Sequence, residues 1–269
     1  MVTDEADAAE PTPPPAVRRD RRGGVLVLTI DRPAARNAVD AAVAAGIETA
    51  LDDAEADDTV HAVVLTGAGD KAFCAGADLK AVAAGQARGL MTRRGGFGGV
   101  TQRELATPLV AAVNGAALAG GCEIVLACDM VVAAEHATFG IPEVTRGLAA
   151  SAGGPMRLAQ RLPLAVAMEL CLTGEPIGAA RARERGLVNR VVPADRVLDE
   201  AVALCDAIAA NGPLAVRGTK QILLAGARLD DAAAWEVTRR VSREVNESED
   251  AIEGATAFAE KRPPVWKGR

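Results

Sequence analysis

The sequence has no tyrosine, and phenylalanine and tryptophan together make up only 2% of its 269 residues. Few aromatic side chains are therefore available for stacking on nucleic-acid bases. Positive charge is not in excess either, because 30 Lys and Arg are set against 36 Asp and Glu, for a net charge of −6 at pH 7. These features predict a protein that binds neither nucleic acid nor an anionic membrane surface.

Metal ligands and disulfide patterns are also scarce. Histidine occurs only at positions 61 and 136, with no pairing motif, so we predict no metal site. The cysteines are odd in number and scattered, and none forms a CxxC pair: Cys74, Cys122, Cys128, Cys171 and Cys205. This pattern argues against a disulfide framework and predicts a reduced, cytoplasmic protein.

Long apolar runs are missing as well. No apolar run reaches the roughly 18 residues that a membrane span needs, so we expect no membrane partner. Residues 1–15 are acidic and rich in proline, and they lack the apolar stretch of a secretory signal. We expect residues 1–22, including the arginine-rich stretch 18–22, to form a disordered tail.

What remains is a globular composition, with 49% hydrophobic and 25% charged residues. Apolar runs of strand length alternate with helical patterns in the first half: 25–30, 59–66, 109–113 and 130–133 for strands, 39–56 and 122–129 for helices. After about residue 150 the pattern is mostly helical, with a late strand at 188–192. We therefore predict an α/β core over residues 23–212 and a helical C-terminal region over 213–269. The glycine- and arginine-rich segment 81–104 predicts a mobile loop with partial helix.

Two glycine-rich turns follow apolar strands, at residues 73–80 and 114–123. Small residues allow a ligand to approach the backbone, and the start of a helix offers free N–H groups. Two such turns that face each other would form an oxyanion hole from main-chain donors. Each turn taken alone is also compatible with tight packing of a helix on a strand.

Two carboxylates stand in apolar surroundings. Glu123 is followed by Ile124, Val125 and Leu126, and Glu143 follows Ile141-Pro142. Glu123 could simply favour a helix dipole, and Glu143 could be a surface turn residue. If both share one cleft, burial and like charge would raise at least one pKa, so that one carboxyl holds a proton while the other accepts one.

Four blocks in this order resemble the enoyl-CoA hydratase/isomerase (crotonase) superfamily: DRPAARNAVD at 31–40, FCAGADLK at 73–80, AAVNGAALAGGCEIVLACD at 111–129 and ATFGIPEVTRGL at 137–148. The tail SEDAIEGATAFAEKRPPVWKGR resembles that of hydratases and carnitinyl-CoA dehydratases. The resemblance implies an α/β fold of the crotonase (ClpP-like) type, a spiral core of ββα units with a helical C-terminal region.

The resemblance also implies roles for single residues. Ala77 and Gly120 would supply the two N–H donors of the oxyanion hole, and Glu123 and Glu143 would be the catalytic pair. Binding of substrate and CoA would fall to a larger set: Arg32, Ala34, Arg36, Ala75, Gly76, Asp78, Leu79, Lys80, Phe258 and Lys261. Phe258 and Lys261 would reach the CoA of a neighbouring subunit. We expect segments 81–104 and 148–156 to line the acyl pocket.

The function that the resemblance implies is enoyl-CoA hydratase, the reversible syn addition of water to a trans-2-enoyl-CoA. The substrate is an acyl-CoA thioester, and no cofactor or metal is expected. The protein would be a homo-oligomer, a hexamer built as a dimer of trimers through residues 213–269. Three alternatives stay open: a carnitinyl-CoA dehydratase-like enzyme, a Δ3,Δ2-enoyl-CoA isomerase and a non-catalytic acyl-CoA-binding regulator. Retention of both glutamates argues against the regulator, and a dienoyl isomerase is disfavoured because Ser151 stands where an Asp or Gly is common.

Overall fold

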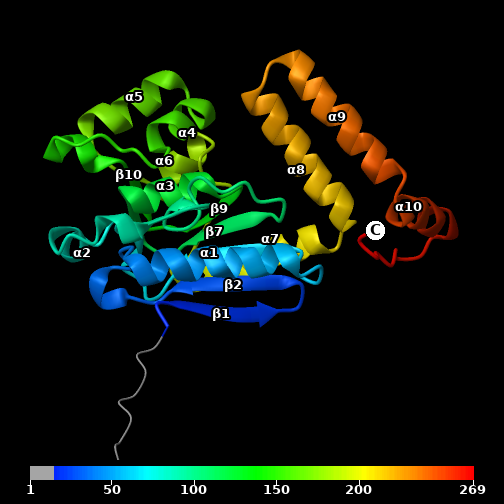
Figure 1. Ribbon diagram of the computed structural model, residues 1–269, viewed down its shortest axis with the longest axis horizontal. Helices are drawn as coiled ribbons and strands as arrows, with labels where there is room; N and C mark the ends of the chain where they lie inside the picture. Colours follow the sequence, from blue (N-terminus) through cyan, green and yellow to red (C-terminus); the bar gives the residue numbers. More distant parts are fainter. Residues whose placement is uncertain (1–14) are drawn as a thin grey trace, which may run out of the picture.

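The computed structural model describes residues 15–269. Figure 1 shows an α/β core from which a group of C-terminal helices extends to one side. The main sheet has six strands in the order β1-β2-β3-β7-β9-β12. Its members are β1 (Val17–Arg22), β2 (Val25–Ile30), β3 (Ala62–Gly67), β7 (Leu109–Val113), β9 (Met130–Ala134) and β12 (Arg190–Val192). All neighbours pair in parallel except β1 and β2, which form an antiparallel hairpin at one edge.

The inner strands are apolar because the sheet is covered on both faces. Every residue of β3 and β7 is buried, which is the pattern expected of parallel strands between layers of helices. Helix α7 (Val197–Ala209) packs on β3, β7 and β9, and α1 (Ala41–Ala56) packs on β1 and β2. Helix α1 begins after Asp40, whose side chain accepts a hydrogen bond from the Val43 amide, and it buries Val43, Ile47 and Leu51 against the core.

A second, four-stranded sheet has the order β11-β10-β8-β4. It consists of β4 (Ala72–Cys74), β8 (Ala116–Leu118), β10 (Thr138–Gly140) and β11 (Ile177–Gly178). Helix α3 (Gly120–Ala127) follows β8 directly, and the 3-10 helix η3 (Pro142–Arg146) follows β10. Around them lie α2 (Leu79–Ala83), α4 (Gly154–Arg161), α5 (Leu164–Thr173) and α6 (Ala179–Glu184), and the short 3-10 helices η1 (Pro33–Ala35) and η4 (Ala194–Arg196) complete the core.

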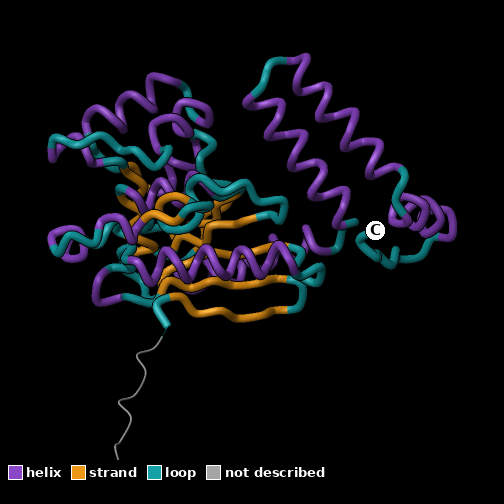
Figure 2. The backbone as a smooth tube through the Cα atoms, in the orientation of Figure 1, coloured by secondary structure: helices purple, strands orange, loops and turns teal. Residues whose placement is uncertain are grey.

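The C-terminal helices are α8 (Pro213–Arg228), α9 (Asp231–Asn246) and α10 (Glu249–Glu260). Figure 2 shows α8 and α9 as an antiparallel pair beside the core, with α10 at its outer end. The side chains of Asp230 and Ser248 cap the starts of α9 and α10. Lys220 of α8 contacts Asp129 of the core at 2.6 Å, which fastens the helix pair to the start of β9. No helix within residues 15–269 combines the length and apolar character that crossing a membrane requires.

The prediction of a disordered tail through residue 22 is wrong for residues 17–22, which form β1. The first 14 residues lie outside the described part of the chain. The arginines of β1 fit an edge strand because their side chains reach acidic partners: Arg18 pairs with Asp31 and Arg19 with Asp53, each at 2.6 Å. Charged side chains on an exposed edge strand also discourage pairing with other chains.

The expectation of a loop over residues 81–104 is also wrong in part. The segment contains the end of α2, the 3-10 helix η2 (Ala87–Leu90) and a hairpin of β5 (Met91–Thr92) and β6 (Gly96–Phe97). Its glycines allow close packing rather than mobility, since a Cβ on Gly99 would lie 2.3 Å from the carbonyl oxygen of Ala44 in α1.

Candidate active site

The carboxyl ends of three parallel strands bring the predicted catalytic segments together. Strand β8 pairs with β4 on one side and with β10 on the other, in parallel. Strands that run in parallel end at the same edge of a sheet, so the segments that follow them become neighbours. Gly76 and Ala77 follow β4, Gly120 and Glu123 follow β8, and Glu143 follows β10.

The amide groups of Ala77 and Gly120 are both available as donors at this edge. Ala77 forms a parallel bridge with Val39, in which Val39 donates to Gly76 and accepts from Asp78, each at 2.8 Å. This pattern turns the N–H of Ala77 itself away from Val39. Gly120 is the first residue of α3, where the N–H has no acceptor within the helix.

The two donor segments are in direct contact. A Cβ added to Gly76 would lie 3.1 Å from the main-chain nitrogen of Gly120 and 3.0 Å from the Cβ of Ala119. Gly76 has a φ of +94°, which a residue with a side chain rarely adopts. The glycine of the first turn thus allows the backbone of the second turn to approach.

Ala119 directs the donor amide of Gly120 and was not anticipated from the sequence. It has φ 52° and ψ −130°, a strained conformation for a residue other than glycine. Its own amide donates to the carbonyl of Gly140 at 2.9 Å, which fixes the turn to the end of β10. Such strain often accompanies functional sites.

Glu123 lies one turn into α3 and is 4% exposed. Its Oε1 accepts hydrogen bonds from the amides of Ala152 at 2.8 Å and Gly154 at 2.9 Å. Burial raises the pKa of Glu123, and these two hydrogen bonds oppose the rise. The amides that donate to Glu123 belong to segment 148–156, which we had expected only to line the acyl pocket.

Glu143 lies at the start of η3 and shares the site with Glu123. Burial is the main cause that raises the pKa of Glu143, and the negative charge of Glu123 raises it further. Its Oε2 is buried and has no hydrogen-bond partner within residues 15–269. An unpartnered buried oxygen here is suited to hold a proton or a small polar ligand.

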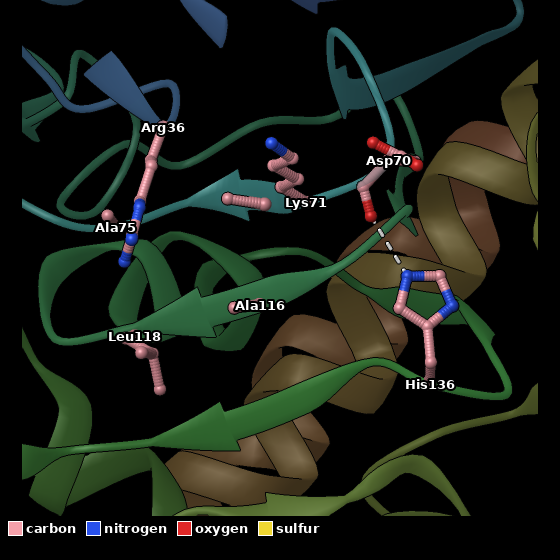
Figure 3. A pocket seen from close by; sticks show the side chains of 8 residues that line it. Arg36, Asp70, Lys71, Ala75, Ala116, Leu118 and His136 are labelled. Carbon is pink, nitrogen blue, oxygen red and sulfur yellow. Dashed lines mark hydrogen bonds between the residues drawn. The ribbon is translucent and has the colours of Figure 1, made fainter. Parts of the chain in front are cut away.

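A pocket of about 590 Å³ opens beside the donor turns. It is lined by Arg36, Asp70, Lys71, Ala72, Ala75, Ala116, Leu118 and His136. Figure 3 shows the Arg36 side chain pointing toward Ala75 and Leu118, while Nε2 of His136 lies 2.9 Å from the main-chain oxygen of Asp70. Ala75 and Leu118 each lie two residues before a donor residue, Ala77 and Gly120, so the pocket adjoins the donor amides. No sequence pattern pointed to Lys71 or His136 as residues of this pocket.

A second pocket, of about 540 Å³, is lined by residues 101–102, 150–153 and 155–157. All of these residues except Arg157 fall in the regions 81–104 and 148–156 that we expected around an acyl group. The pocket shares Ala152 with the support of Glu123. Arg157 donates to the carbonyls of Ala152 at 3.2 Å and Thr101, so one guanidinium joins the two sides of this pocket.

Other predicted binding residues have different settings. The Arg32 guanidinium contacts Asp78 at 2.9 Å and Asp40 at 3.2 Å, so its charge is balanced within the chain. Asp78 also caps α2 by accepting from the amides of Lys80 and Ala81. Leu79 at the start of α2 is 70% exposed.

Ala34, Arg36 and Lys80 are exposed; the first two lie in or beside η1, and Lys80 ends the first donor turn. Phe258 and Lys261 are not brought to this site. Phe258 is 87% exposed, and Figure 1 shows α10 at the outer end of the C-terminal helices, away from α2 and α3. Contact between these two residues and a CoA would therefore need a second subunit.

Comparison with known proteins agrees with this geometry. The family model described as enoyl-CoA hydratase/isomerase matches residues 20–269. A solved enoyl-CoA hydratase from Mycobacterium tuberculosis H37Rv is 46% identical, with a TM-score of 0.91 over 95% of this chain and 100% of that one. A solved carnitinyl-CoA dehydratase from Mycobacterium avium 104 is 50% identical, with a TM-score of 0.75 over 95% of this chain and 100% of that one.

The carnitinyl-CoA dehydratase of Proteus mirabilis is 41% identical over 253 residues, which cover 92% of this chain and 97% of that protein. The resemblance and the fold class read from the sequence are thereby confirmed. By its sequence, its crotonase fold and its relatives, the chain belongs to the enoyl-CoA hydratase/isomerase family of the crotonase superfamily.

Proposed function

We propose that this protein is an enoyl-CoA hydratase that adds water reversibly, in syn fashion, to the 2,3-double bond of a trans-2-enoyl-CoA thioester. The observation that carries the proposal is the placement of two carboxylates, the buried Glu123 and the half-buried Glu143, at the strand edge that also presents the amides of Ala77 and Gly120. A double-bond shift alone has no need of a water molecule held between two carboxyl groups.

The oxyanion hole would act on the thioester carbonyl. Attack of water at C3 moves charge onto the thioester oxygen, and the amides of Ala77 and Gly120 would stabilise that charge. Removal of one such donor from a preorganised site costs about 3–4 kcal/mol of barrier. The strained turn at Ala119 supports this role, because it holds the Gly120 amide in place before the substrate arrives.

The two carboxyl groups would divide the proton transfers. Water must lose one proton and C2 must gain one, so the site needs one ionised and one protonated carboxyl group. We assign Glu143 as the principal acid and base at C2, because its pKa is raised and its Oε2 is buried without a partner within the described residues. Glu123, anchored through one oxygen, would hold the water with the other.

The pocket beside the donor turns would receive part of the CoA moiety. Phosphate groups are bound well by guanidinium and ammonium groups, and Arg36 and Lys71 both line this pocket. The pocket between segments 101–102 and 150–157 would accept the acyl chain. The substrate supplies the CoA, so the proposed reaction calls for no further cofactor.

A second candidate is favoured by the comparisons. Two of the three relatives compared above are carnitinyl-CoA dehydratases, and such an enzyme would apply the same carboxyl pair to an acyl group that carries a quaternary ammonium. The protein would also assemble as a hexamer through residues 213–269, which is consistent with the exposed apolar side chains of Trp235, Ile252 and Phe258.

A panel of substrates separates these candidates. Crotonyl-CoA, a long-chain trans-2-enoyl-CoA, crotonobetainyl-CoA and a 3-enoyl-CoA would each be incubated with the protein, and the products identified by mass spectrometry. The proposal expects a mass gain of one water on the uncharged 2-enoyl esters. Hydration confined to crotonobetainyl-CoA would instead support the dehydratase. Conversion of the 3-enoyl ester without a change in mass, with no hydration of any ester, would overturn both.

A further inference from the structure

A row of three acidic side chains lies along one face of α1. Glu48, Asp52 and Glu55 follow one another at spacings of four and three residues, so they point to the same side of the helix. All three are half-buried, whereas Asp53, in the same helix, is exposed and pairs with β1 instead. We call Glu48, Asp52 and Glu55 the acidic row.

The first two members of the acidic row hold the hairpin segment that follows η2. Glu48 accepts hydrogen bonds from the main-chain amides of Arg94 at 3.1 Å and Gly95 at 3.0 Å. Asp52 contacts the guanidinium groups of Arg94 at 2.7 Å and Arg103 at 2.6 Å. One side of α1 therefore binds both ends of the segment 94–103 through hydrogen bonds and ion pairs.

Glu55 continues the row toward β7. It accepts from the amides of Ala106 at 3.3 Å and Thr107 at 2.9 Å. The Arg103 side chain is only 3% exposed, and Asp52 is the acidic group that balances its charge. A buried charge without its partner is strongly unfavourable, so the pair fixes where the segment enters the core.

The held segment reaches the oxyanion donor. Phe97 lies within it, is nearly buried and packs on Gly120 so closely that a Cβ on Gly120 would lie 2.4 Å from the ring. On its other side the segment lies against α1, where Gly99 approaches the Glu48 amide and the Ala44 carbonyl. A continuous chain of contacts thus leads from the acidic row through Phe97 to Gly120.

We propose that Glu48 and Asp52 are positioning residues for the oxyanion hole, acting through residues 94–103 and Phe97 on the amide of Gly120. The inference rests on the proposed function, because it gives the Gly120 amide its role as donor. Neither carboxylate lines the two pockets that we propose for the substrate; each fixes the wall against which the first turn of α3 is packed.

The test compares Asp52→Asn with Asp53→Asn, which removes a charge from the same helix but from the face toward β1. Asp52→Asn is expected to lower kcat for crotonyl-CoA about tenfold or more, as expected for a displaced catalytic group, with little change in KM. Asp53→Asn is expected to match the unsubstituted protein. The infrared stretch of the thioester carbonyl in a bound, unreactive CoA ester should shift to higher frequency only in Asp52→Asn, because a weaker hydrogen bond polarises the carbonyl less.

A second variant covers the case in which Asp52→Asn does not fold because Arg103 loses its partner. Glu48→Ala removes the acceptor for two amides and leaves no buried charge unpaired. Hydrogen–deuterium exchange of residues 92–103 should then speed up, and the carbonyl stretch should shift as in Asp52→Asn. Equal exchange, stretch and kcat in Glu48→Ala, Asp53→Asn and the unsubstituted protein would overturn the proposal.

The exchange measurement separates this inference from the function on which it rests. If the unsubstituted protein hydrates no enoyl-CoA, the proposed function fails. Faster exchange in Glu48→Ala than in Asp53→Asn would still support the link between the acidic row and residues 92–103. Hydration by the unsubstituted protein, with an unchanged carbonyl stretch in Glu48→Ala, would leave the function standing and sink the positioning role.

Discussion

The Cα of Gly76 faces the main-chain nitrogen of Gly120 so closely that a Cβ in its place would lie 3.1 Å from that nitrogen. This contact joins the turn after β4 to the first residue of α3. The contact sets the distance between the two donor turns. The thioester carbonyl oxygen of the proposed substrate must fit between them.

Substitution of Gly76 by alanine is therefore expected to harm both stability and activity. At a φ of +94° a side chain is strained by about 1–3 kcal/mol, and the new methyl group would crowd the donor amide of Gly120. Gly85 is a matched control, because its φ is +77° but nothing lies within 4 Å of its added Cβ. Chemical denaturation should show a loss for both variants, whereas kcat/KM should fall steeply only for Gly76→Ala. Equal kcat/KM in the two variants would contradict the proposed role of this contact.

The raised pKa of Glu143 predicts a particular dependence of stability on pH. A carboxyl group with a pKa above its ordinary value of 4.5 binds its proton more tightly in the folded state, so its contribution to stability declines as pH rises from 4.5 through the raised pKa. Relative to Glu143→Gln, the unsubstituted protein should lose stability across this range. The measurement is the urea midpoint of both proteins at successive pH values.

Glu253 provides the comparison for that experiment. Its pKa is lowered to about 2, chiefly by the side chain of Arg262. The stabilisation it contributes is fully present above 4.5 and is lost only below that pH, so the difference between Glu253→Gln and the unsubstituted protein should stay constant above pH 4.5. A constant difference for Glu143→Gln as well would show that the Glu143 pKa is not raised.

Arg36 and Lys71 are expected to contribute to affinity rather than to chemistry. Alanine at either position should raise KM for crotonyl-CoA and lower its dependence on ionic strength, while kcat stays within about twofold, because the lost contact is the same in the ground and transition states. Arg185, exposed near the end of α6, serves as a control cation. If Arg36→Ala and Lys71→Ala show the KM of Arg185→Ala, the pocket beside the donor turns does not receive the phosphates.

Asn37 is expected to matter for stability. It is 1% exposed, donates to the carbonyls of Ala68 at 2.9 Å and Ala72 at 2.7 Å, and accepts from the Arg32 amide at 3.0 Å. Asn37→Ala would leave these buried groups without partners, at a cost of about 2–3 kcal/mol. Thermal or urea unfolding measures the loss, and a change under about 0.5 kcal/mol, as at ordinary surface positions, would contradict this account of Asn37.

Much of the core could be predicted because its signals are local. The apolar runs at β3, β7 and β9 have strand length, and the helix over 41–56 shows its buried face in the spacing of Val43, Ile47 and Leu51. The predicted helix start near residue 39 differs little from the observed one, where Asp40 is the N-terminal cap.

Features that depend on distant partners could not be predicted in the same way. In the sequence, β1 resembles a charged tail. The strand with which it pairs, β2, and the acidic residues that pair with its arginines come into contact with it only in the folded protein. No sequence pattern identifies the strained backbone of Ala119. The amides of Ala152 and Gly154 become hydrogen-bond donors to Glu123 only when α4 packs on α3. The proposed catalytic pair could be predicted only through the family resemblance, since an acidic residue in an apolar run is ambiguous alone.

The central claim, that Glu123 and Glu143 together add water to an enoyl-CoA, is tested most directly by the absorbance of the conjugated enoyl thioester. The unsubstituted protein should bleach crotonyl-CoA, while Glu143→Gln should do so about 10²–10⁴-fold more slowly, the range of general acid–base catalysis, and still bind the ester with similar affinity. Bleaching by Glu143→Gln at the unsubstituted rate, or none by the unsubstituted protein despite tight binding of the ester, would contradict the account.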